Sequence, residues 1–174
     1  MKHLISDTRE KKNQHVLDYF EAVGIKYEIA KLDFGDYMDA YRPGIVIDRK
    51  QNIAELAKNV VGKDRDRFVR ELERANSAGS RLVILVEQNR YKDRDRWISV
   101  KEPIDLMLWS SPHTKIRGER VFRSVSGLIA KYGISVQFCD KRTTGRNILR
   151  IIYGDSYEQG PEGVRSIRRH RGIT

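Results

Sequence analysis

Cysteine and histidine are scarce in this sequence of 174 residues. It contains one cysteine, Cys139, and four scattered histidines. A single cysteine excludes an internal disulfide and fits a reducing, cytoplasmic environment. The histidines and the cysteine do not have the spacing of a zinc site. We therefore expect a fold that is held together by its own core and not by disulfides or structural zinc.

Long apolar runs are also missing. No stretch approaches the roughly 20 residues that a membrane-spanning helix needs. The first residues, MKHLISD, lack the apolar segment of a signal peptide. Internal repeats and a linker between domains are absent as well. A single soluble domain is expected, and the chain is long enough to bury a substantial core.

The composition is strongly basic. Lys and Arg number 34 against 24 Asp and Glu, which gives a net charge of +10 and a pI near 9.8. Such a charge attracts polyanions, and phosphate contacts dominate the affinity of proteins for nucleic acid. An acidic membrane surface would also suit this charge, but no basic amphipathic helix is evident. The charge therefore favours nucleic acid as the partner.

Strand and helix patterns alternate along the chain. Strands are expected at 3–6, 25–32, 34–41, 45–50, 82–86 and 134–138, and helices at 13–23, 53–61, 63–78, 118–132 and 144–153. The early hairpin supplies antiparallel strands, and the later crossovers supply parallel ones. This order predicts an α/β fold in which helices cover a mixed sheet.

Residues 88–117 have no sustained period, apart from a possible short helical turn at 104–109, and we expect a long irregular insertion there. It mixes aromatic and basic side chains, which are Tyr91, Trp97, Trp109, Arg90, Lys92, Arg94 and Arg96. The aromatic rings could stack on bases while the basic groups contact phosphate. Alternatively, the tryptophans simply cover the core.

Residues 35–50, GDYMDAYRPGIVIDRK, combine a hairpin pattern with acidic and basic side chains. Strands 34–41 and 45–50 are expected to join at a Pro43–Gly44 turn. Side chains alternate along a strand, so Asp48 and Lys50 share one face. The hairpin could then bring Asp36 alongside Asp48.

This grouping suits a divalent cation. Mg²⁺ usually takes one or two carboxylates and completes its shell with waters and substrate phosphate oxygens. A neighbouring lysine can orient or deprotonate the attacking water, or stabilise the transition state. The alternative is a surface hairpin with solvated charges, because D-x-K is a common sequence.

Five motifs in order resemble the nuclease domain of XPF-type structure-specific endonucleases, within the PD-(D/E)xK superfamily. They are D-T-R-E (7–10), G-D-Y (35–37), I-D-R-K (47–50), D-R-F-V-R-E (66–71) and L-V-I-L-V-E (82–87). The resemblance covers roughly residues 3–154 and is closest to the stand-alone phage and bacterial members. It implies a nuclease domain at 1–154. Residues 155–174 are polar, Gly-rich and basic, and we expect them to form a flexible tail. The resemblance further implies a restriction-nuclease-like α/β/α core and Mg²⁺- or Mn²⁺-dependent cleavage of DNA at branches, flaps or forks.

The resemblance also assigns residues. By position, Asp36 and Asp48 match the metal-binding carboxylates and Lys50 matches the catalytic lysine. The remaining site residues are Asp7, Arg9 and Glu10 from the first motif, Arg49 beside the lysine, and Arg67 in the following helix. DNA contacts are expected from Arg67, from the basic residues of 88–117, and from Arg168 and Arg169 in the tail.

The sequence departs from the family pattern in three ways. Asp48 stands where glutamate is usual, and Ala54 takes the place of a usual aspartate, next to Glu55. No helicase or tandem helix-hairpin-helix pattern accompanies the domain. A non-catalytic DNA-binding or scaffolding module therefore remains an alternative, as do a resolvase and an exonuclease, which share the chemistry.

The last two helices suggest an assembly. Those starting at Gly118 and Thr144 have wide apolar faces, and XPF-type domains pair through this C-terminal region. We expect a homodimer. In the alternative, residues 88–117 fold over the second face and the chain stays monomeric.

Overall fold

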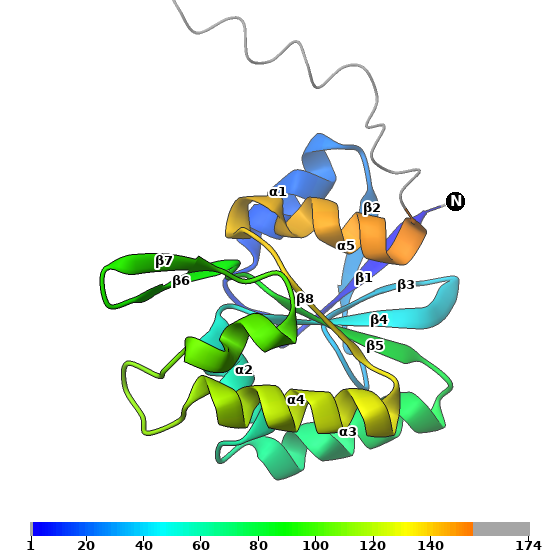
Figure 1. Ribbon diagram of the computed structural model, residues 1–174. Helices are drawn as coiled ribbons and strands as arrows, with labels where there is room; N and C mark the ends of the chain where they lie inside the picture. The colour runs from blue at the N-terminus through cyan, green and yellow to red at the C-terminus, as the bar shows by residue number, and fades with distance from the viewer. Residues whose placement is uncertain (1, 155–174) are drawn as a thin grey trace, which may run out of the picture.

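A mixed sheet of six strands lies between two layers of helices in the computed structural model, which describes residues 2–154 (Figure 1). The strands lie in the order β2-β1-β3-β4-β5-β8. Strand β3 is antiparallel to both of its neighbours, and the remaining pairs are parallel. The mixed α/β class is therefore confirmed. The bounds are β1 (His3–Asp7), β2 (Lys26–Ala30), β3 (Tyr37–Asp39), β4 (Arg42–Lys50), β5 (Arg81–Val86) and β8 (Ser135–Phe138).

Apolar side chains on both faces of the sheet explain the two helical layers. On β5, Leu82 and Ile84 belong to one buried cluster, whereas Val83 and Leu85 belong to the other. A strand that is apolar on both faces must lie inside a sheet that is covered on both sides. One layer contains α1 (Gln14–Ala22) and α5 (Thr144–Tyr153), and the other contains α2 (Ile53–Val60), α3 (Arg65–Ser77) and α4 (Gly118–Tyr132).

The central hairpin turns earlier than the sequence predicted. Asp39 pairs with Arg42, so the turn lies at residues 40–41 and Pro43 and Gly44 belong to β4. The register shifts between Met38, which pairs with Val46, and Asp39, which pairs with Arg42, so Pro43 lies in the irregular part of the ladder. Proline lacks a backbone N–H and is tolerated in a strand at such positions. The predicted Pro43–Gly44 turn was therefore wrong, although the hairpin itself is present.

Residues 88–117 contain a hairpin and a 3₁₀ helix, so the prediction of an irregular insertion was wrong for the hairpin, whereas the helical turn expected at 104–109 is confirmed. Strands β6 (Arg90–Asp93) and β7 (Arg96–Ser99) form a separate antiparallel hairpin, and η1 (Pro103–Leu108) is a 3₁₀ helix. Most side chains of the hairpin are exposed, so no apolar period marked it. The 3₁₀ helix packs on α4, where a Cβ on Gly118 would lie 1.6 Å from the Leu106 carbonyl oxygen. This close approach requires a glycine.

The remaining features lie at the edge of the sheet and toward the C-terminus. Strand β2 is an edge strand, and its Ile29 is 61% exposed. A short 3₁₀ helix, η2 (Lys141–Thr143), leads into α5. The predicted tail at 155–174 lies outside the described residues. Within residues 2–154, none of the helices has the length and apolar character that crossing a membrane requires.

Candidate active site

Strand β4 sends its last side chains to opposite faces of the sheet. Val46 packs in the α2–α3–α4 layer, and Asp48 and Lys50 follow it at intervals of two. Both charged residues are buried, at 4% and 6% exposure. The Lys50 Nζ lies 2.8 Å from each Asp48 carboxylate oxygen and donates a hydrogen bond to Oδ1. The pairing is what makes the burial of two charges tolerable.

Asp36 reaches this pair because of the glycine before it. Gly35 has φ +68°, and a Cβ there would lie 2.3 Å from Val46 Cγ1. The backbone N–H of Asp36 donates to the Ile47 carbonyl, and the backbone N–H of Arg49 donates to Asp36 Oδ2, both at 2.7 Å. The predicted approach of the two carboxylates is therefore present. Burial, and then the negative charges of Asp48 and Glu10, raise the pKa of the Asp36 carboxyl well above its ordinary value.

The charge on Lys50 follows from the same neighbours. Burial alone lowers the pKa of a lysine, but the negative charges of Asp48 and Asp36 outweigh it, and the pKa of Lys50 lies above its ordinary value. In this arrangement the lysine is therefore a cation. It is suited to stabilise negative charge rather than to accept a proton.

Glu71 is a site residue that the sequence analysis missed. From α3, its Oε1 accepts the backbone N–H of Gly35 at 2.8 Å, which holds the loop carrying Asp36. Burial and the negative charge of Asp48 raise the pKa of Glu71. Arg67, Glu71 and Arg74 are spaced i, i+4, i+7 and line one cleft of about 300 Å³ together with Asp36 and Asp48. Glu71 ends the motif at 66–71, so its spacing from Arg67 was the available signal.

Asp7 lies behind the cleft and supports it. Its carboxylate is 2% exposed and accepts hydrogen bonds from the Arg9 side chain and from the Leu32 backbone N–H. Burial raises the pKa of Asp7, but these hydrogen bonds outweigh it and the pKa lies below its ordinary value. Arg9 and Glu10 line the cleft as predicted, whereas Asp7 does not line it but donates its backbone N–H to the Asp36 carbonyl.

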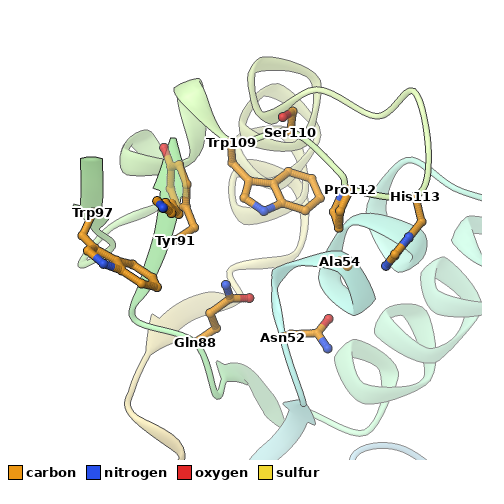
Figure 2. A pocket seen from close by; sticks show the side chains of 10 residues that line it. Asn52, Ala54, Gln88, Tyr91, Trp97, Trp109, Ser110, Pro112 and His113 are labelled. Carbon is orange, nitrogen blue, oxygen red and sulfur yellow. The ribbon is translucent and has the colours of Figure 1, made fainter. Parts of the chain in front are cut away.

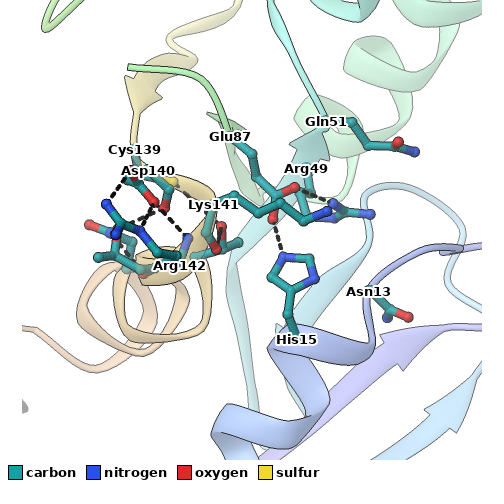
Figure 3. A network of polar contacts seen from close by, with 12 residues as sticks. Asn13, His15, Arg49, Gln51, Glu87, Cys139, Asp140, Lys141 and Arg142 are labelled. Carbon is teal, nitrogen blue, oxygen red and sulfur yellow. Dashed lines mark hydrogen bonds and ion pairs between the residues drawn. The ribbon is translucent and has the colours of Figure 1, made fainter. Parts of the chain in front are cut away.

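Arg49 points to the opposite face and forms the centre of a buried ionic network (Figure 3). Its guanidinium donates to both Glu10 oxygens at 2.7 Å and to Glu87 Oε2 at 2.6 Å. The second Glu87 oxygen contacts His15 Nε2 on α1. The sequence analysis did not assign Glu87 or His15. Glu87 ends the motif at 82–87 and follows the strand beside β4, which was the signal for it.

The donor set fits a hard divalent cation. Asp48 Oδ2 is buried and, apart from its ion pair with Lys50, has no polar partner among residues 2–154. Over the same residues, no three His, Cys, Asp or Glu side chains are grouped as a complete metal site. Two carboxylates suffice for Mg²⁺ or Mn²⁺, because waters and phosphate oxygens complete the shell. Asp36 and Asp48 are the residues that would hold the ion.

The remaining predicted residues lie in different parts of the chain. Glu55 lines the catalytic cleft, whereas the neighbouring Ala54 lines a second cavity. Arg67 lines the catalytic cleft. The basic residues Arg90, Lys92, Arg94 and Arg96 belong to the β6–β7 hairpin. Arg168 and Arg169 lie outside the described residues.

The sheet between helical layers, with two carboxylates and a lysine at one cleft, defines an α/β nuclease-type domain. The model of the ERCC4 domain matches residues 6–150, and the chain therefore belongs to the ERCC4 domain family. Its fold is that of an XPF-type nuclease domain.

Two solved structures show the fold similarity. XPF from Aeropyrum pernix has a TM-score of 0.61 at 19% identity, covering 86% of this chain and 59% of that one. XPF from Aeropyrum pernix in complex with DNA has a TM-score of 0.61 at 16% identity, covering 100% of this chain and 76% of that one. This chain therefore spans less than two thirds of the first XPF chain. No curated protein matches the sequence.

Proposed function

We propose that this protein is a metal-dependent DNA endonuclease that hydrolyses phosphodiester bonds at branched, flap or fork structures. The observation that carries the proposal is the convergence of Asp36, Asp48 and Lys50 in one open cleft. A DNA repair, recombination or replication role follows from such substrates. A DNA substrate of this kind also supports our proposal that the protein acts inside the cell.

Each residue of the cleft has a role in this proposal. Asp36 and Asp48 hold Mg²⁺ or Mn²⁺. A bound ion of this kind makes a water ligand more acidic and neutralises charge on the phosphorus. Lys50, as a cation, stabilises the negative charge that develops on the phosphoryl oxygens. Arg67 and Arg74, both exposed on α3, are placed to contact the phosphates on either side of the scissile bond.

The surrounding residues keep these groups in position. Glu71 holds the Gly35 backbone, and the Arg49 backbone N–H holds the Asp36 carboxylate. The Arg49 side chain anchors the same strand to the opposite layer through Glu10 and Glu87. Because each support is a charge-assisted hydrogen bond inside the fold, the carboxylates are preorganised before DNA binds.

The direct test is cleavage of end-labelled linear, flap, fork and four-way DNAs in Mg²⁺, in Mn²⁺ and in EDTA. We expect cleavage at the junctions of flap or fork DNA with either metal, and none in EDTA. Undiminished cleavage in EDTA would overturn the metal dependence. Binding without cleavage under every condition would instead establish the alternative, a non-catalytic DNA-binding module.

We also propose a homodimer, but its contact surface differs from the one expected from the sequence, which was formed by α4 and α5. Helices α4 and α5 bury their apolar faces against opposite sides of the sheet, and η1 covers part of α4, as the monomeric alternative required. Three exposed apolar side chains lie close together in sequence on η1, where Ile104, Met107 and Leu108 are 40–59% exposed. A second copy of the chain is the proposed partner for this surface.

A further inference from the structure

A second cavity of about 460 Å³ lies beside the catalytic cleft (Figure 2). It is bounded by the β6–β7 hairpin on one side and by residues 109–113 on the other. The start of α2 separates the two hollows. Gln51 and Glu55 line the catalytic cleft, whereas Asn52 and Ala54 line the second cavity. A molecule in the cavity would therefore lie next to a DNA strand bound in the catalytic cleft.

The walls of this cavity are aromatic and mostly fixed. Tyr91 and Trp109 are 5% and 6% exposed, and the Tyr91 hydroxyl donates to the Asp105 carbonyl at 2.9 Å. Trp97 differs, because its ring is 64% exposed at the rim of the cavity. The Arg90 guanidinium lies 5.0 Å from the centre of that ring. A fixed aromatic wall with an exposed tryptophan at its edge offers flat surfaces for a planar ligand.

The polar groups of the cavity point to an anionic ligand. Lys92 is exposed at its edge, and no carboxylate from residues 2–154 lines it. Gln88 is held in place because its Oε1 accepts the Ile53 N–H and its Nε2 donates to the Arg90 carbonyl. Flat aromatic surfaces beside cations suit a nucleotide, since every base has a π-face and every nucleotide carries a phosphate.

We propose that this cavity binds an unpaired nucleobase of the DNA strand held in the catalytic cleft. The inference rests on the proposed DNA substrate and deepens it. A base stacked on Trp97 must be unstacked from its duplex, and such bases occur at flaps, forks and gaps. The cavity therefore supplies a preference for junctions that contain single strand, within the nuclease domain itself.

The first test is the Trp97→Ala variant, with binding measured by fluorescence anisotropy in the absence of divalent metal. Loss of one base–aromatic stack is worth about 1–3 kcal/mol, which corresponds to roughly 5- to 150-fold in affinity. We expect at least fivefold weaker binding to a fork with one unpaired arm. Binding to a fully paired duplex of equal length should change less than twofold.

The matched control is Tyr41→Ala, which removes another exposed aromatic side chain at the β3–β4 turn. It should leave the affinity for both DNAs unchanged. Trp97→Phe, which keeps an aromatic face, should retain most of the affinity for the fork. Unchanged fork binding by Trp97→Ala, or an equal loss on fork and duplex, would overturn the proposal.

The second test locates the base. Abasic nucleotides are placed one at a time along the unpaired arm, and each fork is bound by the parent protein and by Trp97→Ala. We expect one position near the junction where the abasic site weakens the parent at least fivefold but weakens the variant less than twofold. Equal losses in both proteins at every position would contradict stacking on Trp97. If Trp97→Ala binds forks as tightly as the parent and still cleaves DNA in the presence of metal, the proposed base-binding role of the cavity is refuted. The proposed nuclease activity is then unaffected.

Discussion

The backbone N–H of Arg49 donates to the Asp36 carboxylate at 2.7 Å, while the Arg49 side chain points to the other face of the sheet and pairs with Glu87. One residue thus joins the catalytic cleft to the buried network of Glu10 and Glu87. The position of Asp36 depends on the register of β4, and that register is anchored by the guanidinium. The geometry of the site and the stability of the fold are therefore coupled through Arg49.

Replacing Arg49 by methionine should destabilise the protein strongly. The change leaves two carboxylates, Glu10 and Glu87, buried without their cation, and such a loss costs about 3–5 kcal/mol of unfolding free energy. Urea denaturation measures it. The control is Arg142→Met, which breaks an ion pair at an 87% exposed side chain and should leave the unfolding free energy nearly unchanged. If Arg49→Met is as stable as the control, the ionic network of Arg49 does not stabilise the fold and the prediction is wrong.

Asp36→Asn and Lys50→Ala should each abolish most of the cleavage and leave DNA binding intact. These side chains act on the metal and on developing charge, whereas affinity comes from many phosphate contacts. We expect turnover to fall by about 100-fold or more, measured on the preferred labelled substrate. Anisotropy without metal should show affinity within about threefold of the parent. Unchanged turnover in either variant would refute the assignment.

Glu71 should matter for cleavage through both its charge and its hydrogen bond. Glu71→Gln keeps an acceptor for the Gly35 N–H but removes the charge near Asp48 and Lys50, so turnover should fall about tenfold with little change in stability. Glu71→Ala should in addition cost about 1 kcal/mol of unfolding free energy. The matched control on the same helix is the exposed Glu73→Gln. Equal effects of the Glu71 and Glu73 substitutions would count against a role in the site.

The Asp7 carboxylate should contribute stability that depends on pH. Its pKa is lower in the folded protein than the ordinary value of 3.8, so the contribution is complete above that pH and is lost as pH falls through the lower folded value. Asp7→Asn should therefore lower the unfolding free energy at pH 7 by about 1–3 kcal/mol. The gap to the parent should narrow near pH 3. A gap of constant size between pH 7 and pH 3 would show that the carboxylate charge is not involved.

Light scattering at micromolar concentration tests the homodimer. We expect a mass near twice 20.3 kDa that falls to the monomer value on Leu108→Glu, because a charge in a buried contact prevents pairing. Leu108 is 59% exposed in the single chain, so its substitution should not unfold the protein. Arg123→Glu, at an exposed position of α4, serves as the control and should stay dimeric. A mass near 20.3 kDa that stays constant as the concentration rises would refute the dimer.

The local pattern of apolar and polar residues was enough to predict most of the helices and strands. The apolar run at 82–86 predicted a strand, and β5, which is buried on both faces, confirms it. Alternation along 45–50 predicted that Asp48 and Lys50 share a face, and their 2.8 Å contact confirms it. Both are short-range consequences of strand geometry, in which neighbouring side chains point to opposite sides whatever the rest of the chain does.

The tertiary structure alone decided which distant groups meet. Glu71 and Glu87 looked like ordinary charged residues at motif ends, and packing of α3 and β5 brought them to Gly35 and Arg49. The β6–β7 hairpin could not be predicted, because its exposed strands carry no apolar period. By itself, the sequence determined the layers, the alternation along β4 and the residue types of the site. Contacts between segments far apart in the chain depend on packing, and packing decided the supports of Asp36 and the cavity beside Trp97.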